Sequence, residues 1–573
     1  MLYARNICCE IGRGEERVSL LDKVSFCVPQ GHFMAIVGPS GCGKTTLLKA
    51  IAGIIRETDG AFFWKGRNLA EDGDFEPEEI GYVPQFSVAC EELTVDESVE
   101  CAARLRVKAP EDEINAVIDR ALAETGLEEI ADRRVKILSG GQKRRLALAM
   151  ELVSSPKLLI CDEVTSGLDP SSEREIVELL YELSRKDGRI VISVTHSLAM
   201  MELYDSVLVM NRGCVAYHGA PGAMCHYFGV ESFEEVYPRL ARRSAEEWHN
   251  SWVKRRSFYY EQLEAAHIEK YERMGQSPPL PDEEEEAAER PGFLRQFLVL
   301  LGRRFRVLAR DRGQLLLQAA MIIVFPVVVA LFADKGNEQL QQLTQSRSAD
   351  LTEEVQQRQD VAAARAKVGS AVSGLVMFEV ILLGLMGANN AAREIAGERR
   401  IVEKERFAGV SSGAYLASKV VYLCLLLLVQ SVWMYVFVQH FWPFRGDSAV
   451  HLRYLILANA AMTAVCLGIS ANARTADQAS LLSIYLVGFQ LPLSGAILAL
   501  PGALERFIQP FISAYWAWSG SIQGGLDPEV LKAVNSIAAT AFSEPALCTA
   551  VLCGHVAAGI ALAYAGLKRS QAD

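Results

Sequence analysis

The 573-residue chain lacks several features that mark particular classes of protein. Its formal net charge of −12 leaves no broad basic surface, which argues against a nucleic-acid partner. The 13 cysteines include no CxxC pair of the kind that holds a metal, and most lie in the first half, where a reducing cytoplasm is the simple expectation. No Asn-x-Ser/Thr sequon occurs, which fits a prokaryotic protein better than a glycosylated one. The chain does not start with a charged segment followed by an apolar core, so no cleaved signal peptide is expected.

Hydrophobic residues make up 50% of the chain and charged residues 22%, a balance that suggests a polar half joined to an apolar half. Residues 1–230 alternate apolar runs with helical patterns, which predicts an α/β domain around a largely parallel sheet. Residues 231–292 are charged and helical and end in an acidic stretch, so they are expected to form a linker rather than a docking tail. The predicted strands are 33–37, 157–161, 190–194 and 206–210.

Residues 293–573 are predicted to form an all-α membrane domain. Six stretches are long enough to cross a bilayer, each close to the ~20 residues that a membrane-spanning helix requires. Buried helices of a large soluble core are the alternative, which is weak because the runs are nearly uncharged. The six stretches are 315–333, 369–391, 416–441, 452–471, 478–499 and 546–567.

Basic residues flank these stretches at four sites. Because Lys and Arg collect in cytoplasmic loops, six spans put all four sites on the side of residues 1–230. The polar, helical segment 334–368 and the segment 501–545 then face outward. The basic residues are Arg303, Arg304, Arg306, Arg310, Arg312, Arg393, Arg399, Arg400, Lys404, Arg406, Arg474, Lys568 and Arg569.

A phosphate-binding loop follows the first predicted buried strand. Its glycines let backbone N–H groups turn toward phosphate oxygens, and the helix that begins near Lys44 adds its positive end. Lys44 is expected to reach the β- and γ-phosphates, and the Thr45 hydroxyl to bind Mg²⁺. Cys42 is expected to contribute its backbone rather than redox chemistry. The predicted nucleotide-binding residues are Gly38, Pro39, Ser40, Gly41, Cys42, Gly43, Lys44, Thr45, Thr46 and Asp162.

Two carboxylates and a histidine follow later strands. Asp162 ends an apolar strand, where it can hold Mg²⁺ directly or through water, and Glu163 is the candidate to polarise the attacking water. An ordinary strand-end turn would explain two adjacent carboxylates, but it is a poor explanation after a complete phosphate loop. His196 ends the strand at 190–195 and is expected to contact the γ-phosphate rather than to serve only in packing.

The pentapeptide Leu138-Ser139-Gly140-Gly141-Gln142 lies between the loop and these carboxylates. In this order the elements resemble the ATP-binding-cassette (ABC) ATPases, in which such a signature closes over a nucleotide held by another subunit. The resemblance implies an α/β P-loop ABC ATPase domain that uses ATP and Mg²⁺. It also implies that Gln85 is the Q-loop residue, joining the Mg²⁺ site to the membrane domain, and that Ser166-Gly167-Leu168-Asp169 is the D-loop at the dimer interface.

One feature departs from the family pattern. ABC ATPases usually stack adenine on an aromatic residue roughly 25 positions before the first loop glycine. Here Cys8-Cys9-Glu10-Ile11 offers none, and Tyr3 is the nearest upstream candidate. The choice between ATP and GTP therefore stays open.

An ATPase domain that precedes six spans is similar to the half-transporters of the ABCG (white/pigment/multidrug) subfamily. Further matches are 93–98, 217–219 and 392–400, and the last of these, with 403–406, forms coupling helices in that subfamily. A membrane-surface amphipathic helix is the alternative for that segment. Gln142 and the long segment 334–368 point to a bacterial relative.

The resemblance implies a half-transporter that dimerises in the plasma (bacterial inner) membrane with its ATPase domain in the cytoplasm. A homodimer is the economical expectation because no catalytic element is degenerate, although a heterodimer is also open. The expected activity is export of a hydrophobic or amphipathic molecule, such as a lipid, a sterol-like compound or a drug. The alternatives are a lipid-extracting machine that serves an external partner and a signalling or force-transmitting ATPase.

Two polar residues interrupt the predicted spans. Glu379 in the second span is costly there unless it is paired or faces a cavity, so contact with substrate or a proton and an interhelical hydrogen bond are both open. Gln490, in Gln490-Leu491-Pro492 of the fifth span, suggests a local break in the helix near the translocation path.

Overall fold

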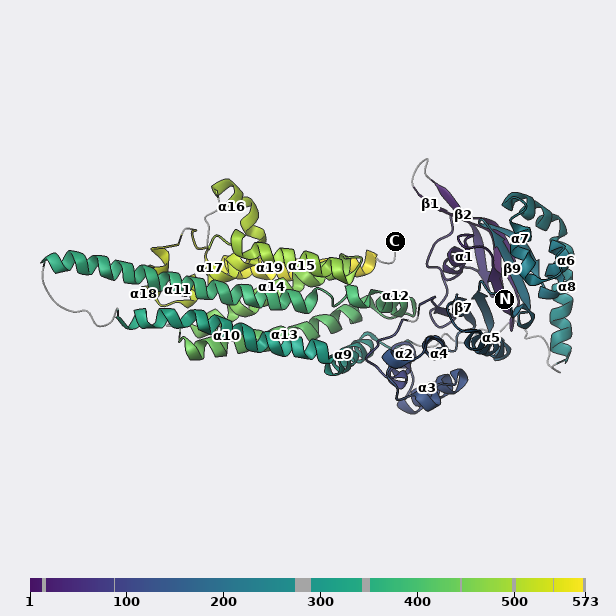
Figure 1. Cartoon of the computed structure of the whole chain (residues 1–573), viewed down its shortest axis with the longest axis horizontal. Helices are drawn as coiled ribbons and strands as arrows, with labels where there is room; N and C mark the ends of the chain where they lie inside the picture. Colours follow the sequence, from purple (N-terminus) through teal and green to yellow (C-terminus); the bar gives the residue numbers. More distant parts are fainter. Residues whose placement is uncertain are drawn as a thin grey trace. The chain divides into compact units, whose positions relative to one another are not determined.

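The computed structural model describes residues 1–12, 17–86, 88–273, 290–342, 351–443, 446–496, 501–538 and 540–569. These residues fall into two units, which Figure 1 draws in the colours of the sequence. The first unit is Met1–Gln296 together with Lys404–Val410, and the second is Phe297–Glu403 together with Ser411–Asp573. The chain thus passes into the second unit, returns to the first for one short segment and passes back again.

A six-stranded sheet forms the centre of the first unit, in the order β10-β9-β3-β8-β7-β6. Only β10 pairs antiparallel with its neighbour; the other pairs are parallel. All residues of β3, β7 and β8 are buried, as expected for a parallel sheet covered on both faces. The strands are β3 (Phe33–Val37), β6 (Ile80–Val83), β7 (Leu158–Asp162), β8 (Ile190–Val194), β9 (Ser206–Asn211) and β10 (Cys214–Gly219). This confirms the predicted α/β class.

An antiparallel sheet in the order β2-β1-β4-β5 completes the first unit. One face of it is apolar: Phe26, Phe62 and Trp64 are at most 2% exposed and join the core of the six-stranded sheet. The strands are β1 (Leu2–Ile11), β2 (Val18–Val28), β4 (Asp59–Trp64) and β5 (Arg67–Asn68).

The helices of the first unit are α1 (Lys44–Ile51), α2 (Val95–Arg106), α3 (Glu111–Thr125), α4 (Gly140–Leu152), α5 (Pro170–Arg185), α6 (Pro221–Phe228), α7 (Val236–Leu240) and α8 (Ala245–Arg273). Helix α8 lies in the segment assigned from the sequence to a charged linker. Its Trp252 and Tyr259 pack edge-on against the buried ring of Tyr217 in β10. Aromatic side chains therefore fix the first part of this segment to the sheet.

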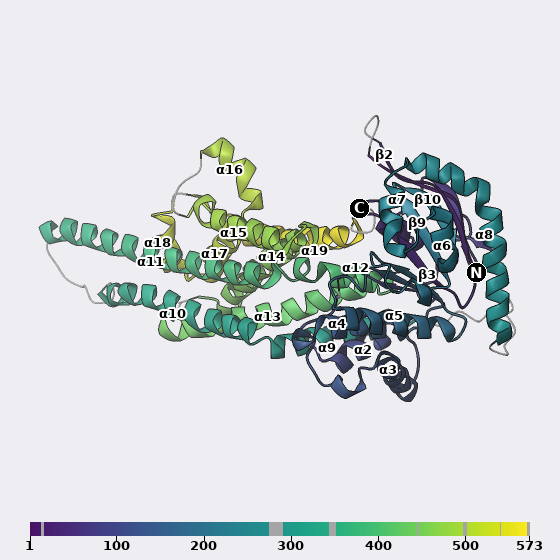
Figure 2. The same cartoon turned by 45° about the vertical axis from the view of Figure 1, so that its right-hand side comes forward.

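The described residues of the second unit form helices and one isolated β-bridge, between Gly446 and Leu526, and the longest helices run side by side in Figures 1 and 2. Of the five candidate membrane-spanning helices, α14 is the most enclosed: 72% of its most apolar stretch is buried, against 22% in α10 and in α19. The helices are α9 (Phe293–Arg310), α10 (Arg312–Gln342), α11 (Leu351–Ala391), α12 (Arg399–Phe407), α13 (Ser412–Phe441), α14 (Ser448–Asn472), α15 (Ala476–Leu493), α16 (Gly502–Ile508), α17 (Ser513–Gly525), α18 (Pro528–Asn535) and α19 (Pro545–Arg569).

Among the described residues, five helices are long and apolar enough to cross a membrane: Arg312–Leu331, Arg365–Phe407, Ser412–Phe441, Ser448–Asn472 and Pro545–Arg569. They match five of the six predicted spans. The other predicted span, 478–499, falls on α15, which ends at Leu493, directly after Pro492. Residues 497–499 of that span lie outside the described residues. The helices make the chain an integral membrane protein.

Helix α17 lies in the segment 501–545, which is predicted to lie on the outer side of the membrane. Nearly every residue of α17 is buried. A Cβ atom on Gly520 would lie 2.3 Å from the ring of Tyr454 in α14, so only a glycine allows this close approach. Trp518 donates a hydrogen bond from Nε1 to the backbone oxygen of Ser373 in α11, 3.2 Å away. The alternation of small and aromatic residues thus packs α17 into the bundle.

A ring of three amides joins α10, α11 and α13. Gln318 donates to Asn390 (2.7 Å), Asn390 to Gln430 (2.9 Å) and Gln430 back to Gln318 (3.0 Å). All three residues are at most 6% exposed. Each amide is satisfied by the next, which is how polar side chains are tolerated between apolar helices.

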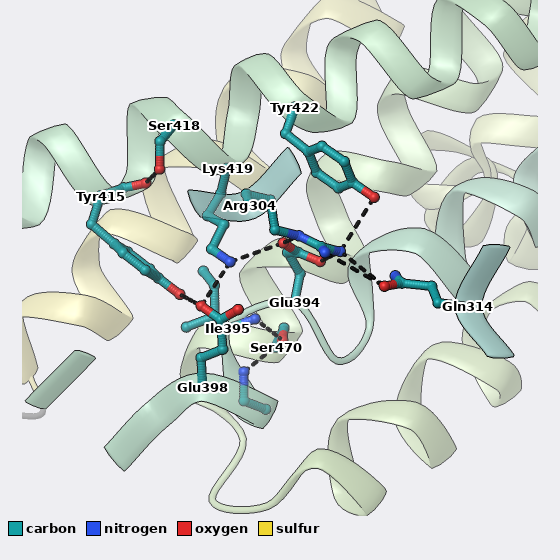
Figure 3. Close-up of polar contacts among 11 residues, drawn as sticks. Arg304, Gln314, Glu394, Ile395, Glu398, Tyr415, Ser418, Lys419, Tyr422 and Ser470 are labelled. Atoms are coloured by element: carbon teal, nitrogen blue, oxygen red, sulfur yellow. Dashed lines mark hydrogen bonds and ion pairs between the residues drawn. The ribbon is translucent and has the colours of Figure 1, made fainter. Parts of the chain in front are cut away.

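A charged cluster fixes the link between α11 and α12 (Figure 3). Arg304 of α9 donates from Nε and Nη2 to the two oxygens of Glu394, at 2.5 and 2.9 Å. Lys419 of α13 donates to Glu394 at 2.9 Å and to Glu398 at 2.7 Å. The side chains of Arg304, Glu394 and Lys419 are only 3–6% exposed, so each charge depends on the others for its solvation.

We predict that Glu394→Gln destabilises the second unit by about 3–5 kcal/mol, because Arg304 and Lys419 lose a buried counter-charge. Asp477→Asn is the matched control: Asp477 pairs with Arg393, and both side chains are well exposed. That change should leave stability within ~0.5 kcal/mol. Thermal unfolding of the two variants in lipid nanodiscs checks this. Equal midpoints would contradict the assigned role of Glu394.

Candidate functional site

The phosphate-binding loop occupies residues 38–43, between β3 and α1. Gly43 has a φ of +100°, and a Cβ atom there would lie 2.8 Å from the backbone oxygen of Leu20. A Cβ atom on Gly38 would lie 2.4 Å from the backbone oxygen of Met210. Both positions therefore require glycine for steric reasons, while a Cβ atom on Gly41 would meet nothing within 4 Å.

Lys44 lies inside this loop. Its Nζ donates to the backbone oxygens of Gly38 (2.9 Å) and Pro39 (3.2 Å), so the ammonium group is held where the loop curls. No side chain caps the start of α1, which leaves the first-turn N–H groups, including that of Thr46, available to an anion. Burial raises the pKa of the Cys42 thiol despite the nearby Lys44, which fits a backbone role for Cys42.

Asp162 ends β7 and meets two hydroxyl groups. Thr45 donates from Oγ1 to Asp162 Oδ1 at 3.2 Å, and the Tyr82 hydroxyl donates to Oδ2 at 3.4 Å. Burial raises the pKa of the Asp162 carboxyl, and the hydrogen bond from Thr45 opposes that rise. A hydroxyl and a carboxylate side by side are oxygen ligands of the kind that Mg²⁺ prefers, so these residues fit the predicted metal.

No group of three or more His, Cys, Asp or Glu side chains that could enclose a metal occurs in the part of the chain that the structure describes. Such a protein cage is not needed for Mg²⁺, which usually takes one or two protein ligands and completes its shell with phosphate and water. Thr45 and Asp162 therefore would hold the ion together with the nucleotide. Gln85 is hydrogen-bonded to Glu163, the residue that follows Asp162.

The three residues predicted to be catalytic are brought together at Glu163. Gln85 donates from Nε2 to Glu163 Oε2 at 2.7 Å, and His196 Nε2 lies 2.8 Å from Oε1. The backbone of Glu163 is left-handed, with a φ of +48°. Such a conformation is unfavourable for a residue with a side chain and is found at functional sites. The adjoining strand β8 fixes it, because Glu163 N–H donates to the backbone oxygen of Val194.

The signature residues form the beginning of α4. Ser139 caps the helix: its Oγ accepts from the Gln142 N–H at 3.3 Å, while Gln142 Oε1 accepts from the Ser139 N–H at 3.0 Å. This reciprocal pair is a capping box, a motif that accepts Glu or Gln at the fourth position. Leu138 is buried. A Cβ atom on Gly140 would lie 3.3 Å from Leu168, and one on Gly141 would lie 3.6 Å from Ser172, so the signature adjoins the D-loop.

Asp169 caps α5. Its Oδ1 accepts from the backbone N–H groups of Ser171 and Ser172, both at 3.1 Å, and its Oδ2 accepts from the Ser172 hydroxyl at 2.7 Å. The Ser172 hydrogen bonds lower the pKa of the Asp169 carboxyl, so it is ionised at neutral pH. The D-loop is thereby held in a fixed shape.

Tyr82 was not among the site residues predicted from the sequence, although it lies three positions before Gln85. Its ring packs against Phe407, with centroids 5.9 Å apart, while its hydroxyl contacts Asp162. Its position is the one feature that could have indicated a role at the site, because Tyr82 is on β6, the strand next to the one that ends in Asp162. Tyr3, the nearest candidate for stacking adenine, packs against Phe63 in β4 with centroids 6.0 Å apart.

The two polar residues of the predicted spans are both engaged in the second unit. Gln490 Oε1 accepts from the Ser513 hydroxyl (3.2 Å) and from the Ala514 N–H (3.0 Å), so it holds the start of α17. Glu379 Oε2 lies 3.0 Å from His451 Nε2.

Two protein families match the chain. Residues 21–166 match the family described as "ABC transporter", a range that includes the phosphate loop, Gln85, the signature and Glu163. Residues 295–517 match the family described as "ABC-2 type transporter", which covers most of the helical unit.

Curated relatives match the chain over part of their own length. The ABC transporter ATP-binding/permease protein Rv1747 of Mycobacterium tuberculosis is 30% identical over 88% of this chain and 55% of its own. The Fe(3+) ions import ATP-binding protein FbpC 1 of Pectobacterium atrosepticum is 35% identical over 35% of this chain and 57% of its own. The chain thus spans little more than half the length of these relatives. A solved structure of the ATP-binding cassette MJ0796 is 27% identical, covers 38% of this chain and 98% of its own, and has a TM-score of 0.35.

We predict that Gln142→Glu keeps the capping box and leaves ATPase activity within about twofold of wild type, because Glu accepts the same N–H group. Gln142→Ala removes one half of the box and should destabilise the helix end by ~0.5–2 kcal/mol. Thermal unfolding and steady-state ATPase rates of both variants check this. Equal effects of the two substitutions would show that Gln142 acts by something other than capping.

Proposed function

The chain joins an ABC transporter ATPase domain to an ABC-2 type transporter membrane domain, and we propose that it is one half of a dimeric, ATP-driven exporter of the ABCG type. Its substrate would be a hydrophobic or amphipathic molecule. The observation that supports this most is the convergence of Gln85 and His196 on Glu163, beside the Thr45–Asp162 pair. The Lys- and Arg-rich loops support an orientation in a bacterial inner membrane with the ATPase domain on the cytoplasmic side.

Each residue of the site has a role in this proposal. Lys44 leaves the backbone oxygens that it contacts and neutralises the β- and γ-phosphates of ATP. Thr45 and Asp162 would hold Mg²⁺, which would supply positive charge against the negative charge of the phosphates. Glu163 accepts a hydrogen bond from the attacking water, and its two present partners, Gln85 and His196, orient it. His196 also reaches the γ-phosphate.

The signature residues act on the ATP of a second subunit. Ser139 and the two glycines present the first N–H groups of α4, and a helix start is a favourable place for a phosphate. One chain contains one phosphate loop and one signature, so two chains complete two sites. Because every catalytic element in this chain is intact, a homodimer with two competent sites is the preferred assembly.

The segment Lys404–Val410 carries the coupling between hydrolysis and transport. It packs within the first unit, although the chain on both sides of it belongs to the second. Lys404 Nζ lies 3.0 Å from Glu151 Oε1, an ion pair without hydrogen-bond alignment, and Arg106 donates two hydrogen bonds to the same carboxylate at 2.9 and 3.1 Å. Burial would raise the pKa of Glu151, but Arg106 and Lys404 outweigh it and lower the pKa to about 2.

The signature helix and the predicted Mg²⁺ site each have a contact to the segment Lys404–Val410. Glu151 lies on α4, the helix that begins at the signature. Tyr82 contacts Asp162 through its hydroxyl and Phe407 through its ring. A displacement of α4 or of β6 during ATP binding would therefore move Lys404 and Phe407, and with them the chain that continues into the second unit.

A second candidate function is delivery of extracted lipid to an external partner. Helix α11 has 41 residues, which at ~1.5 Å per residue is roughly twice the ~30 Å of a bilayer core. The excess length, which includes residues 351–368 of the segment 334–368, would project from the membrane. The relative named for iron import matches 35% of this chain, and the proposed direction rests on the fused membrane domain.

We predict that Glu163→Gln lowers the ATPase rate at least a hundredfold while ATP still binds, because the amide cannot accept a proton from the polarised water. Inside-out vesicles with the wild-type chain should accumulate a lipophilic dye in an ATP-dependent way, and vesicles with Glu163→Gln should not. ATP hydrolysis by Glu163→Gln at the wild-type rate would refute the catalytic assignment. Hydrolysis without accumulation of any lipid or dye would favour the signalling alternative.

We predict that Lys404→Met lowers transport per ATP hydrolysed by roughly fivefold or more, while basal hydrolysis persists, because Glu151 keeps Arg106 but loses the coupling segment. The control is Lys186→Met, since Lys186 pairs with Glu124 at 3.6 Å and is half exposed. Dye accumulation and phosphate release are measured in the same vesicles. A parallel loss of both would assign Lys404 to ATPase stability instead of coupling.

A further inference from the structure

A tyrosine of α7 reaches the candidate site, although α7 follows the last strand of the first unit. The Tyr237 hydroxyl donates to the backbone oxygen of His196 at 3.5 Å. The same hydroxyl group accepts a hydrogen bond from the backbone of Gly38, the first residue of the phosphate-binding loop. A hydroxyl group has one donor and two acceptor positions, so it can make both contacts at once. Tyr237 therefore joins the phosphate-binding loop to the segment that carries His196.

The register of the central sheet shows where this bridge lies. Strands β3 and β8 are parallel, and their last pair is Ile36 with Val194. One further backbone hydrogen bond follows, from the Thr195 N–H to the Ile36 oxygen at 3.2 Å. Gly38 and His196 each come two residues after that last pair, at corresponding positions. The tyrosine hydroxyl thus joins the two chain segments beyond the end of the β3–β8 ladder.

Helix α7 holds this tyrosine against the core of the first unit. Val236 and Leu240, on either side of Tyr237, are at most 1% exposed and belong to that core. The Leu240 backbone oxygen accepts from Trp248 Nε1 at 3.1 Å, which ties the end of α7 to the beginning of α8. The ring of Tyr237 is partly buried against the same core. Its hydroxyl group is therefore held from a fixed base.

The Tyr237 hydroxyl group keeps its proton at neutral pH. Burial raises the pKa of Tyr237 to about 12, and the hydrogen bond from Gly38 opposes that rise in part. An ionised tyrosine has no O–H group and could not donate to the His196 backbone oxygen. Both hydrogen bonds are therefore available from acidic to mildly alkaline pH.

The two segments that Tyr237 joins have different tasks in the proposed hydrolysis. The loop that begins at Gly38 holds the phosphates of ATP, whereas His196 Nε2 lies 2.8 Å from Glu163 Oε1. A change in the spacing of the segments would move the imidazole relative to the γ-phosphate, and a misplacement of about 1 Å can cost about 100-fold in rate. Binding of ATP depends less on this spacing, because Lys44 and the N–H groups of the loop contact the phosphates themselves.

We propose that Tyr237 is a positioning residue for ATP hydrolysis, because its hydroxyl group sets the distance between the phosphate-binding loop and His196. The role of Tyr237 rests on the role proposed for His196. It extends the candidate site into residues 231–292, which the sequence predicts to be a linker and which lie beyond the matched range 21–166. Packing of the ring alone would also explain where Tyr237 lies, but it would make no use of the hydroxyl group.

Tyr237→Phe in the full chain tests the proposal, because it removes the hydroxyl group and keeps the ring. Phosphate release in lipid nanodiscs, at a series of Mg²⁺–ATP concentrations, gives kcat and KM. We expect kcat to fall roughly three- to tenfold, the effect of one hydrogen bond, while KM stays within about twofold. The matched control is Tyr260→Phe on α8, where the hydroxyl lies 3.3 Å from His218 Nδ1 of β10. Both constants of that variant should stay within about twofold of wild type.

Three results would overturn the proposal. A wild-type kcat in Tyr237→Phe would leave the ring as the part of the side chain that matters. A rise in KM as large as the fall in kcat would assign the hydroxyl group to the binding of ATP. An equal loss of activity in Tyr260→Phe would show that any lost tyrosine hydroxyl in α7 or α8 weakens the ATPase domain.

His196→Ala distinguishes this proposal from the proposed function. The variant keeps the backbone oxygen that Tyr237 contacts and loses the imidazole, so it should hydrolyse ATP slowly. Tyr237→Phe added to it should lower kcat no further, and a further three- to tenfold loss would overturn the proposal. Wild-type hydrolysis by His196→Ala would contradict the role proposed for His196. A slow His196→Ala together with a wild-type Tyr237→Phe would overturn the role of Tyr237 alone.

Discussion

The register of the parallel strands is the constraint on which the catalytic centre depends. Val83 pairs with Cys161, and Asp162 pairs with Val194, so β6, β7 and β8 end at the same edge of the sheet. Gln85, Glu163 and His196 are the residues that follow these ends by one or two positions. Hydrogen bonds then join them at 2.7 and 2.8 Å. A shift of one residue in either pairing would direct these side chains to opposite faces.

Much of this centre could be predicted from the sequence because its signals are local. Glycines at 38, 41 and 43 with Lys44 describe a loop whose backbone conformation few other residues allow, and all three have positive φ angles. The apolar runs before Asp162 and His196 are short and uninterrupted, as in buried parallel strands. The α/β class, the helical membrane domain and the adjacency of the predicted catalytic residues follow from such patterns. Their roles in hydrolysis stay predictions.

The remaining features depend on partners far apart in sequence. Glu394 reads as part of a charged surface segment, yet Arg304, 90 positions earlier, makes it a buried ion pair. Tyr82 contacts Asp162 because β6 pairs with β7, a pairing between strands far apart in the sequence. Helix α17 carries a mixture of Ser, Gly and aromatic residues that predicts neither a span nor a loop, and the ring of Tyr454 decides its position. Helix α15 contains Asp477 and Gln490, which shortens its apolar stretch. The positions of these residues and helices are determined by tertiary packing and not by the local sequence pattern.

Because the chain returns to the first unit at Lys404–Val410, a single cut between the two units would not separate them cleanly. Many two-part machines can be encoded as separate polypeptides that meet after synthesis. Here a cut after residue 296 would give an ATPase fragment with Phe407 missing from the side of Tyr82 and with Glu151 holding only Arg106. The fragment would lack a piece of its own surface. The first unit therefore finishes folding only after the ribosome has made two of the predicted spans.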